Sequence, residues 1–184
     1  MHSFLLAALA ACASAAPLPA AGPSAEAVAA LVKFKAPARW HRSDYANSMG
    51  SDPVVAFERG SERIAVYAYG APGSAYATPE AFLKGPAAST MGRPPVRDGS
   101  ATIGSKELPL YRRGYPLMDT DPHIPATRPP RMGDEIFCLL PPTSDGRFVV
   151  LAHDQNIPAT ETSASAGAAW LAFLKTVRPA GPKP

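Results

Sequence analysis

The stretches Gly133-Asp-Glu-Ile-Phe-Cys-Leu-Leu140 and Arg147-Phe-Val-Val-Leu-Ala-His153 lie close together in the chain and decide its fold. Two prolines and Asp145-Gly146 separate them, which predicts a β-hairpin. The first stretch is apolar on both sides, because Phe137 and Cys138 point to opposite faces of a strand. A strand that is buried on both faces needs a helix or a long loop over each of them. The hairpin therefore predicts the centre of a covered sheet.

Shorter apolar runs on either side of this hairpin predict further strands. They cover residues 31–35, 53–58, 63–69, 101–104 and 107–115. A loop at Arg59-Gly60-Ser61 joins two of these runs into an early hairpin. Asp98-Gly99 is expected to form another hairpin turn.

Two segments have the pattern of helices. Thr78-Pro79-Glu80 predicts a helix start, because threonine caps the first turn, proline suits the first helical position and a carboxylate is favoured there. Gly85-Pro86 interrupts or ends this helix, and residues 163–178 carry apolar side chains at helical spacing. The order of elements predicts an α+β fold, a mostly antiparallel sheet of about six to seven strands with a mid-chain helix and a C-terminal helix packed on it.

The first residues of the chain predict export. Residues 1–12 resemble a signal peptide, with an apolar core from Phe4 to Ala11 but no Lys or Arg before it. Leu9-Ala10-Ala11-Cys12 is similar to a bacterial lipobox, which predicts that Cys12 is acylated and becomes the new N-terminus. Cleavage after Ala15 is the alternative. The expected location is a membrane-anchored lipoprotein of the cell envelope, or a periplasmic or secreted protein.

The rest of the 184-residue chain divides into three parts. Residues 13–30 contain mainly Ala, Pro, Ser and Gly and are expected to be a tether, within which Ser24 to Leu31 could form a short helix. Residues 31–178 have the length and the apolar runs of a single domain. Residues 179–184 are expected to be a loose tail.

The segment Phe34-Lys35-Ala36-Pro37-Ala38-Arg39-Trp40, the early hairpin, the mid-chain helix and a final helix that carries a tryptophan resemble the PsbP-like and DcrB-like families of α-β-α sandwich proteins. The resemblance covers residues 31–178, rests on the order of elements and carries over no active-site residue. It implies a small exported or envelope protein that acts as an accessory or binding module, mostly without established catalysis.

The net charge of +3 comes from one segment of the chain. Residues 93–131 contain seven basic and four acidic side chains, and the remainder is neutral. Arginine pairs with anionic groups and stacks on aromatic rings. The predicted binding residues are the arginines of this segment and two tyrosines beside them: Arg93, Arg97, Tyr111, Arg112, Arg113, Tyr115, Arg128 and Arg131. The alternative is a solvated surface on which these arginines do not converge.

An exported protein rarely meets nucleic acid, so the basic segment predicts an envelope protein, an anionic lipid headgroup or an acidic glycan as partner. The sequence predicts no cofactor. Gly99 to Lys106 has the wrong residue order for a phosphate loop, and no dinucleotide fingerprint is present. The sequence makes no prediction of the oligomeric state.

Asp119, Asp121 and His123 have the donor types that suit zinc or a harder divalent cation. The distant candidate partners are His153, Asp154, His41 and Asp44. A solvated turn is the alternative, because the neighbouring prolines break the run.

Cys138 is expected to be a buried structural thiol. A nucleophilic cysteine needs a base within hydrogen-bond reach. Pairing Leu140 with Arg147 puts Cys138 opposite Val149 and leaves His153 too far along the hairpin to serve as that base.

These patterns together predict a non-catalytic envelope module that is lipid-anchored or secreted and binds a partner or an anionic surface through the segment 93–131. The competing class is a metal-dependent hydrolase that uses Asp119, Asp121 and His123. A structural surface protein without a discrete site is the third possibility.

Overall fold

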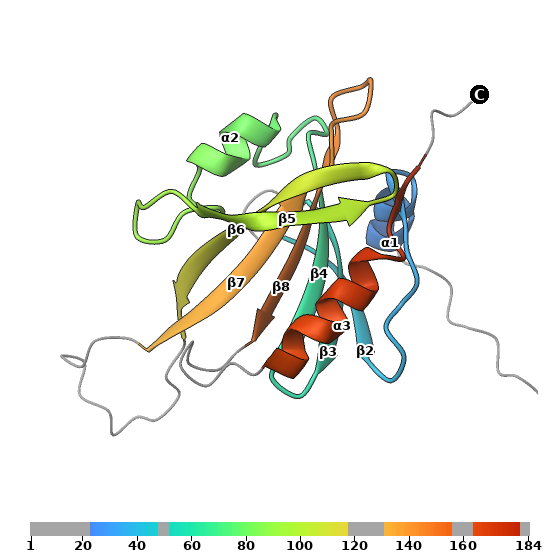
Figure 1. Ribbon diagram of the computed structural model, residues 1–184. Helices are drawn as coiled ribbons and strands as arrows, with labels where there is room; N and C mark the ends of the chain where they lie inside the picture. The colour runs from blue at the N-terminus through green and yellow to red at the C-terminus, as the bar shows by residue number, and fades with distance from the viewer. Residues whose placement is uncertain (1–22, 48–51, 118–130, 156–163, 181–184) are drawn as a thin grey trace, which may run out of the picture.

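The computed structural model describes residues 23–47, 52–117, 131–155 and 164–180. Within these residues, one antiparallel sheet has the strand order β2-β3-β4-β8-β7-β6-β5 (Figure 1). Its strands are β2 His41–Ala46, β3 Pro53–Arg59, β4 Glu62–Tyr69, β5 Val96–Ile103, β6 Lys106–Pro116, β7 Met132–Leu139 and β8 Phe148–Gln155. A small second sheet pairs β1 Val32–Lys33 with β9 Arg178–Pro179. The helices are α1 Pro23–Ala29, α2 Pro79–Lys84 and α3 Ala164–Leu174.

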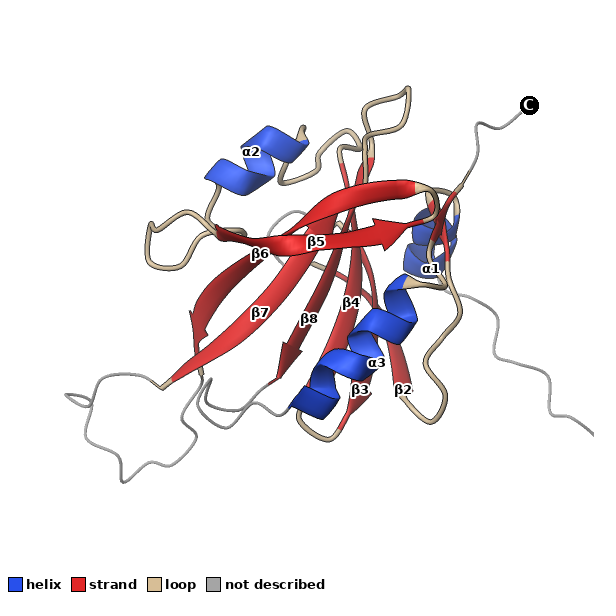
Figure 2. Ribbon diagram, viewed as in Figure 1, coloured by secondary structure: helices blue, strands red, loops and turns tan. Residues whose placement is uncertain are grey.

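This architecture confirms the predicted α+β class (Figure 2). Helix α3 lies across β8, β4 and β3 on one face of the sheet, and α1 packs on the same face (Figure 1). Helix α2 packs on the opposite face through Phe82. None of the helices within the described residues is long and apolar enough to span a lipid bilayer.

The deciding hairpin is present at the centre of the sheet as β7 and β8, but its predicted register is wrong. Leu139 pairs with Val150 and Cys138 with Leu151, so His153 lies opposite Ile136. The connection is wider than predicted because Thr143 organises it: its amide and hydroxyl both donate to the carbonyl of Arg147, at 2.8 Å each. Arg147 therefore belongs to the loop.

Helix α2 begins as the sequence predicts. The Thr78 hydroxyl accepts a hydrogen bond from the Ala81 amide at 3.1 Å, and Pro79 is the first helical residue. The helix ends at Gly85, whose amide donates to the Phe82 carbonyl at 3.0 Å.

Two features of the sheet edges differ from the prediction. Strand β2 was not predicted, because His41–Ala46 is polar and mostly exposed at the edge of the sheet. Strand β5 continues through Asp98-Gly99, where its pairing with β6 shifts register at a bulge. The predicted hairpin turn at Asp98-Gly99 is therefore wrong. The turn between β5 and β6 falls at Gly104-Ser105, and Gly104 has the positive φ of +63° that favours glycine.

Both ends of the predicted domain extend further than expected. Part of the stretch assigned to the tether forms α1, where Ala25 and Val28 are buried in the core. Part of the stretch assigned to the tail forms β9, and the Ala180 amide donates to the Leu31 carbonyl at 2.8 Å. Burial of two small apolar side chains and closure of a two-stranded sheet stabilise segments whose composition resembles a linker.

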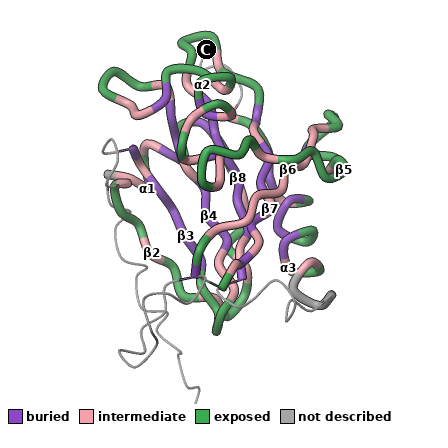
Figure 3. Tube along the Cα trace, turned by 90° about the vertical axis from the view of Figure 1, so that its left-hand side faces the viewer, coloured by how far each residue is buried: buried purple, intermediate pink, exposed green. Residues whose placement is uncertain are grey.

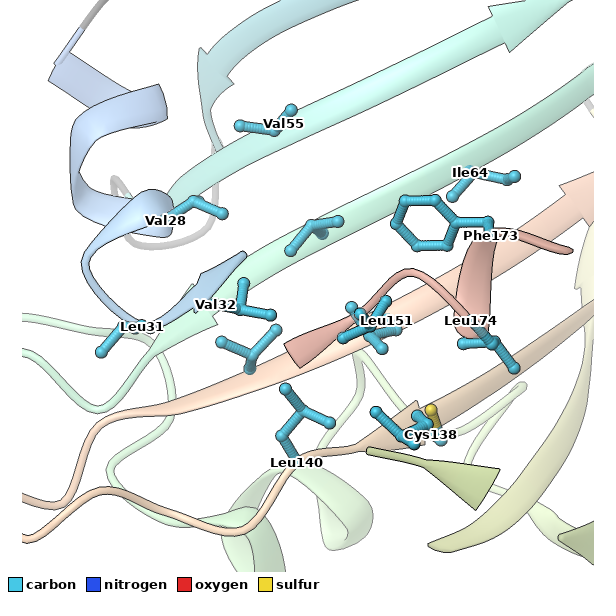
Figure 4. Close-up of a cluster of buried hydrophobic side chains, with 14 of the residues drawn as sticks. Val28, Leu31, Val32, Val55, Ile64, Cys138, Leu140, Leu151, Phe173 and Leu174 are labelled. Carbon is cyan, nitrogen blue, oxygen red and sulfur yellow. The ribbon is translucent and has the colours of Figure 1, made fainter. Parts of the chain in front are cut away.

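Mainly aliphatic side chains fill the space between the sheet and helices α1 and α3, and we call this set the α3-face core (Figure 4). Val28, Leu31 and Val32 approach it from the N-terminal segment, while Phe173 and Leu174 approach it from α3 (Figure 4). The sheet contributes side chains from its central strands: Val55, Phe57, Ile64, Val66, Cys138, Val149 and Leu151.

The opposite face carries a mainly aromatic set that we call the α2-face cluster. Its buried members are Tyr69, Tyr76, Phe82, Ala88, Phe137, Phe148, Val150 and Ala152. Together the two clusters bury the central strands on both sides, whereas β2 and β5 remain largely exposed at the edges (Figure 3). This confirms that Phe137 and Cys138 face opposite cores.

Candidate functional site

The structure separates the two arginines at the centre of the predicted basic segment. Arg112 and Arg113 are adjacent in β6, so their side chains leave opposite faces of the sheet. Arg112 pairs with Asp98 at 2.7 Å and with Asp134 at 3.1 Å. Arg113 donates from Nε to the Glu135 carboxylate on the α2 face. The two arginines therefore do not form one basic patch, and each has a carboxylate beside it.

The other predicted binding residues are spread over the molecule. Arg93 and Arg131 are exposed in loops, and Arg97 is exposed on β5. Tyr111 shares the face of Arg113 and stacks on Phe137 with 5.6 Å between ring centroids. The Tyr115 hydroxyl donates to the Gln155 carbonyl at 2.8 Å. Arg128 lies outside the described residues.

A pocket of about 260 Å³ opens on the α2 face of the sheet. Strands β4, β7 and β8 form its floor, and Arg113 enters it from β6. Ala152 on β8 contributes a small side chain to this floor. The other lining side chains are mainly aromatic, with a few polar groups among them: Asn47, Tyr67, Tyr69, Phe82, Ala87, Glu135, Phe137 and Val150.

The aromatic side chains that form the walls of this pocket pack against one another. Phe82 from α2 packs edge-on against Phe137 and tilted against Tyr69, at centroid distances of 5.8 and 5.4 Å. Tyr76 packs edge-on against both Tyr69 and Phe82, and its hydroxyl accepts from the Ala87 amide at 2.9 Å. These contacts fix the walls in place without a ligand.

A row of charged side chains crosses the sheet beside the pocket. Neighbouring strands place Glu58 beside Arg63, Arg63 beside Asp154, Asp154 beside Glu135, and Glu135 beside Arg113. Arg63 donates to Asp154 at 3.4 Å. We call the four inner residues, Arg63, Asp154, Glu135 and Arg113, the charged row.

The two central carboxylates of the charged row are strongly desolvated. The side chains of Asp154 and Glu135 are only 13% and 6% exposed. Burial raises the pKa of Asp154 to about 6; Arg63 opposes this rise and the carboxylate of Glu135 adds to it. Because the Glu135 carboxylate lies directly opposite on the paired strand, Asp154 is poised to take up a proton near pH 6.

Two tyrosine hydroxyls beside the charged row accept hydrogen bonds from Arg63. Burial raises the pKa of Tyr67 to about 12, so its hydroxyl stays protonated at neutral pH. Arg63 donates to that hydroxyl at 3.1 Å and also to the hydroxyl of Tyr45 on β2. The Asn47 amide donates to the Tyr69 hydroxyl at 3.4 Å at the edge of the pocket.

The predicted metal ligands are not brought together by the described structure. Asp119, Asp121 and His123 lie outside the described residues. His41 and Asp44 lie on the edge strand β2, where Asp44 pairs with Arg42 at 2.9 Å. His153 and Asp154 are adjacent on β8 and therefore face opposite sides of the sheet. Within the described residues no three potential metal ligands cluster.

Cys138 lies in the α3-face core and is fully buried. Burial raises the pKa of its thiol to about 12, so no thiolate forms near neutral pH. This agrees with the predicted structural role, and a nucleophilic role would need the thiolate.

The sequence did not indicate two residues of the charged row, Arg63 and Glu135, as binding groups, and it indicated Asp154 only as a distant candidate metal ligand. The available signal was the alternation in β7, where Glu135 lies two residues before Phe137 and so shares its face. A carboxylate on an otherwise apolar face of a strand indicates a partner on the neighbouring strand. Identifying that partner required the register of the sheet.

No protein-family model, curated protein or solved structure matches this chain.

Proposed function

We propose that this protein is a non-catalytic binding module that holds a small amphipathic molecule in the pocket on the α2 face. The observation that carries the proposal is a preformed aromatic pocket with a charged group at its edge. Binding sites for small molecules are typically concave, mainly apolar and furnished with a few polar groups that orient the ligand. Tyr69, Phe82 and Phe137 supply the apolar walls, and Arg113 with Glu135 supplies the polar groups.

The pocket replaces the extended basic surface as the preferred site. A surface that binds anionic lipid or glycan needs several cations on one side. Arg112 faces away from the pocket and is neutralised by Asp98 and Asp134. Of Arg112 and Arg113, only Arg113 lines the pocket.

A binding role also fits the chemistry of the described residues. The pocket contains hydroxyl, amide and guanidinium groups held by hydrogen bonds, and the thiol of Cys138 is buried on the other side of the sheet. An accessory binding role is what the resemblance to the PsbP-like and DcrB-like families implies. The alternative is a metal-dependent hydrolase that uses Asp119, Asp121 and His123, and elemental analysis of the purified protein for one equivalent of zinc tests it.

We further propose that the module acts outside the cytoplasm and that Cys12 is its lipid anchor. The lipobox-like sequence before Cys12 supports this proposal. Mass spectrometry of the mature N-terminus tests it: an acylated Cys12 supports the anchor, a chain that starts at Ala16 supports secretion alone, and an intact Met1 contradicts export.

A set of single-ring compounds tests the pocket. Indole, benzoate, benzamide and benzylamine are titrated separately and binding is read by saturation-transfer NMR. We expect at least one of them to bind with one-to-one stoichiometry. Ala152→Leu fills the floor of the pocket and Ala87→Leu fills its edge, so each is expected to abolish binding.

Ala172→Leu is the matched control, because Ala172 is exposed on α3, on the other face of the sheet. It adds the same side-chain volume and is expected to leave binding unchanged. Binding by none of the four compounds contradicts the proposed function. Binding that survives both filling substitutions contradicts it as well.

A further inference from the structure

Arg113 has hydrogen-bonding capacity that the protein leaves unused. A guanidinium carries five N–H donors. Within the described residues, only the Nε donor of Arg113 is used, in its bond to Glu135. The terminal amino groups form no hydrogen bond there, although the side chain is only 22% exposed and its guanidinium lies 5.9 Å from the centre of the Phe137 ring.

The shape of the pocket limits what these donors meet. A dry cavity of about 150 Å³ is enough to hold one benzene ring. The volume of about 260 Å³ therefore accommodates one ring with a short substituent, and a larger ligand would have to project into solvent. The walls formed by Tyr69, Phe82 and Phe137 are suited to a flat ring.

We propose that the pocket binds a small aromatic carboxylate, with the ring against Phe82 and Phe137 and the carboxylate on the terminal amino groups of Arg113. Guanidinium and carboxylate form paired, charge-assisted hydrogen bonds that a neutral amide or an amine does not reproduce. This inference rests on the proposed function, since it names the ligand class of the same pocket.

The charged row couples this binding to a proton. A ligand carboxylate on Arg113 brings a third negative charge next to Glu135 and Asp154. The charged and titratable groups around Asp154 are Arg63, Glu135, Arg113 and Tyr115, and Tyr67 shares Arg63 with it. Arg63 and Arg113 are permanently charged, and burial raises the pKa of both tyrosines, so their hydroxyls stay protonated. The new repulsion is therefore relieved by proton uptake on Asp154. Affinity for an anion should therefore rise as the pH falls, and affinity for a cation should fall.

Calorimetric titrations with benzoate, benzamide and benzylamine at pH 8 and pH 5.5 test the inference, because the three probes differ mainly in charge. We expect benzoate to bind about tenfold more tightly than benzamide at pH 5.5. We also expect benzoate to lose roughly threefold to tenfold in affinity between pH 5.5 and pH 8, since each proton taken up changes affinity by at most tenfold per pH unit.

Three substitutions identify the groups involved. Arg113→Gln should remove the preference for benzoate over benzamide while leaving the weak binding of benzamide. Glu135→Gln removes the competing carboxylate and should tighten benzoate binding at pH 8, so the inference stays testable if Arg113→Gln fails to fold. Arg112→Gln is the matched control, because Arg112 leaves the other face of the same strand; it should change neither quantity.

Equal binding of the three probes would overturn the inference and leave the proposed pocket intact. Tightest binding of benzylamine, with affinity that rises with pH, would assign the pocket to a cation and would also overturn it. If none of these three probes binds, the inference is overturned; if indole does not bind either, the proposed function itself is contradicted.

Discussion

The two faces of the sheet differ in the side chains that they bury and in the helices that cover them. The α3-face core is closed by two helices, and its buried side chains are mainly aliphatic (Figure 4). The α2 face is covered by one short helix, is mainly aromatic, and carries the charged row next to a pocket. The first arrangement gives stability through apolar burial, whereas the second holds polar groups at a concave surface, which is what a binding site requires.

The buried polar groups of the two faces also differ in their partners. On the α3 face His153 stacks on Trp170. Three buried polar atoms there have no hydrogen-bond partner among the described residues: His153 Nε2, Gln155 Oε1 and Trp170 Nε1. On the α2 face the carboxylates of Asp154 and Glu135 each have an arginine. The pKa shifts follow this difference, since burial lowers the pKa of His153 and raises that of Asp154.

The largest predicted effect is on the α3 face. Trp170 is 2% exposed and packs against His153 and Phe173. Trp170→Ala should reduce the free energy of unfolding by about 3–5 kcal/mol, because it removes a large buried side chain and leaves a cavity. Urea denaturation followed by circular dichroism measures this. Leu171→Ala is the control, since Leu171 is 50% exposed, and a similar loss in both variants would contradict the assigned packing.

On the α2 face we predict a smaller change, an increase in the free energy of unfolding. The pKa of Asp154 in the folded protein, about 6, is above its value in the unfolded chain. The folded state therefore binds this proton more tightly, and stability falls as the pH rises from about 4 to 6. Asp154→Asn mimics the protonated form and should raise the free energy of unfolding at pH 8 by roughly 2 kcal/mol.

Urea denaturation of the wild type and of Asp154→Asn at pH 5 and pH 8 measures this effect. Asp98→Asn is the control, because Asp98 is 44% exposed and should change stability little. If Asp154→Asn destabilises the protein at pH 8 as much as at pH 5, the carboxylate is stabilised by Arg63 more than it is desolvated, and the assigned electrostatics are wrong.

His153 should give the opposite pH dependence. Its pKa is lowered by burial, so the folded state disfavours the imidazolium and stability is lost as the pH falls through about 6.5 and below. His153→Phe in the Asp154→Asn background should flatten the remaining change in stability between pH 7.5 and pH 5. A pH dependence that persists unchanged in this double variant would show that His153 is not its source.

The smallest effect is expected at Cys138. Its thiol is buried and has a pKa of about 12, so iodoacetamide should not modify it in the folded protein at pH 8. Modification measured by mass spectrometry should appear only when urea unfolds the chain. Labelling at the rate of an exposed cysteine under native conditions would contradict the closed packing of the α3 face.

The parts of the fold that local residue patterns control could be predicted from the sequence. The start of α2 at Thr78-Pro79 and the two-sided burial of β7 depend on neighbouring residues, and both were predicted. Strand β2 was missed because an edge strand needs only main-chain pairing and tolerates exposed polar side chains. The short helix at Ser24 to Leu31 was predicted and is present as α1, but its place in the core was missed, because small side chains such as Ala25 gain stability only from tertiary packing.

The candidate site depends even more on long-range pairing. The segment 93–131 was predicted to bind because its basic residues are close in sequence. The side chains of Arg112 and Arg113 nevertheless point to opposite faces of the sheet. In the charged row, Glu135 and Asp154 come from the β7–β8 hairpin, whereas Arg63 comes from β4, which is distant in sequence. Such a set follows from the order of strands in the sheet, which the sequence did not predict.

Chemical-shift mapping of the backbone amides tests the central claim, that the α2 face is the binding face, most directly. Benzoate is added to isotopically labelled protein at pH 5.5. The predicted result is a saturable set of shifts at Tyr67, Phe82, Arg113 and Phe137, with α3 unaffected. Shifts confined to α3 or to the exposed strand β5, or no saturable shifts at all, would contradict it.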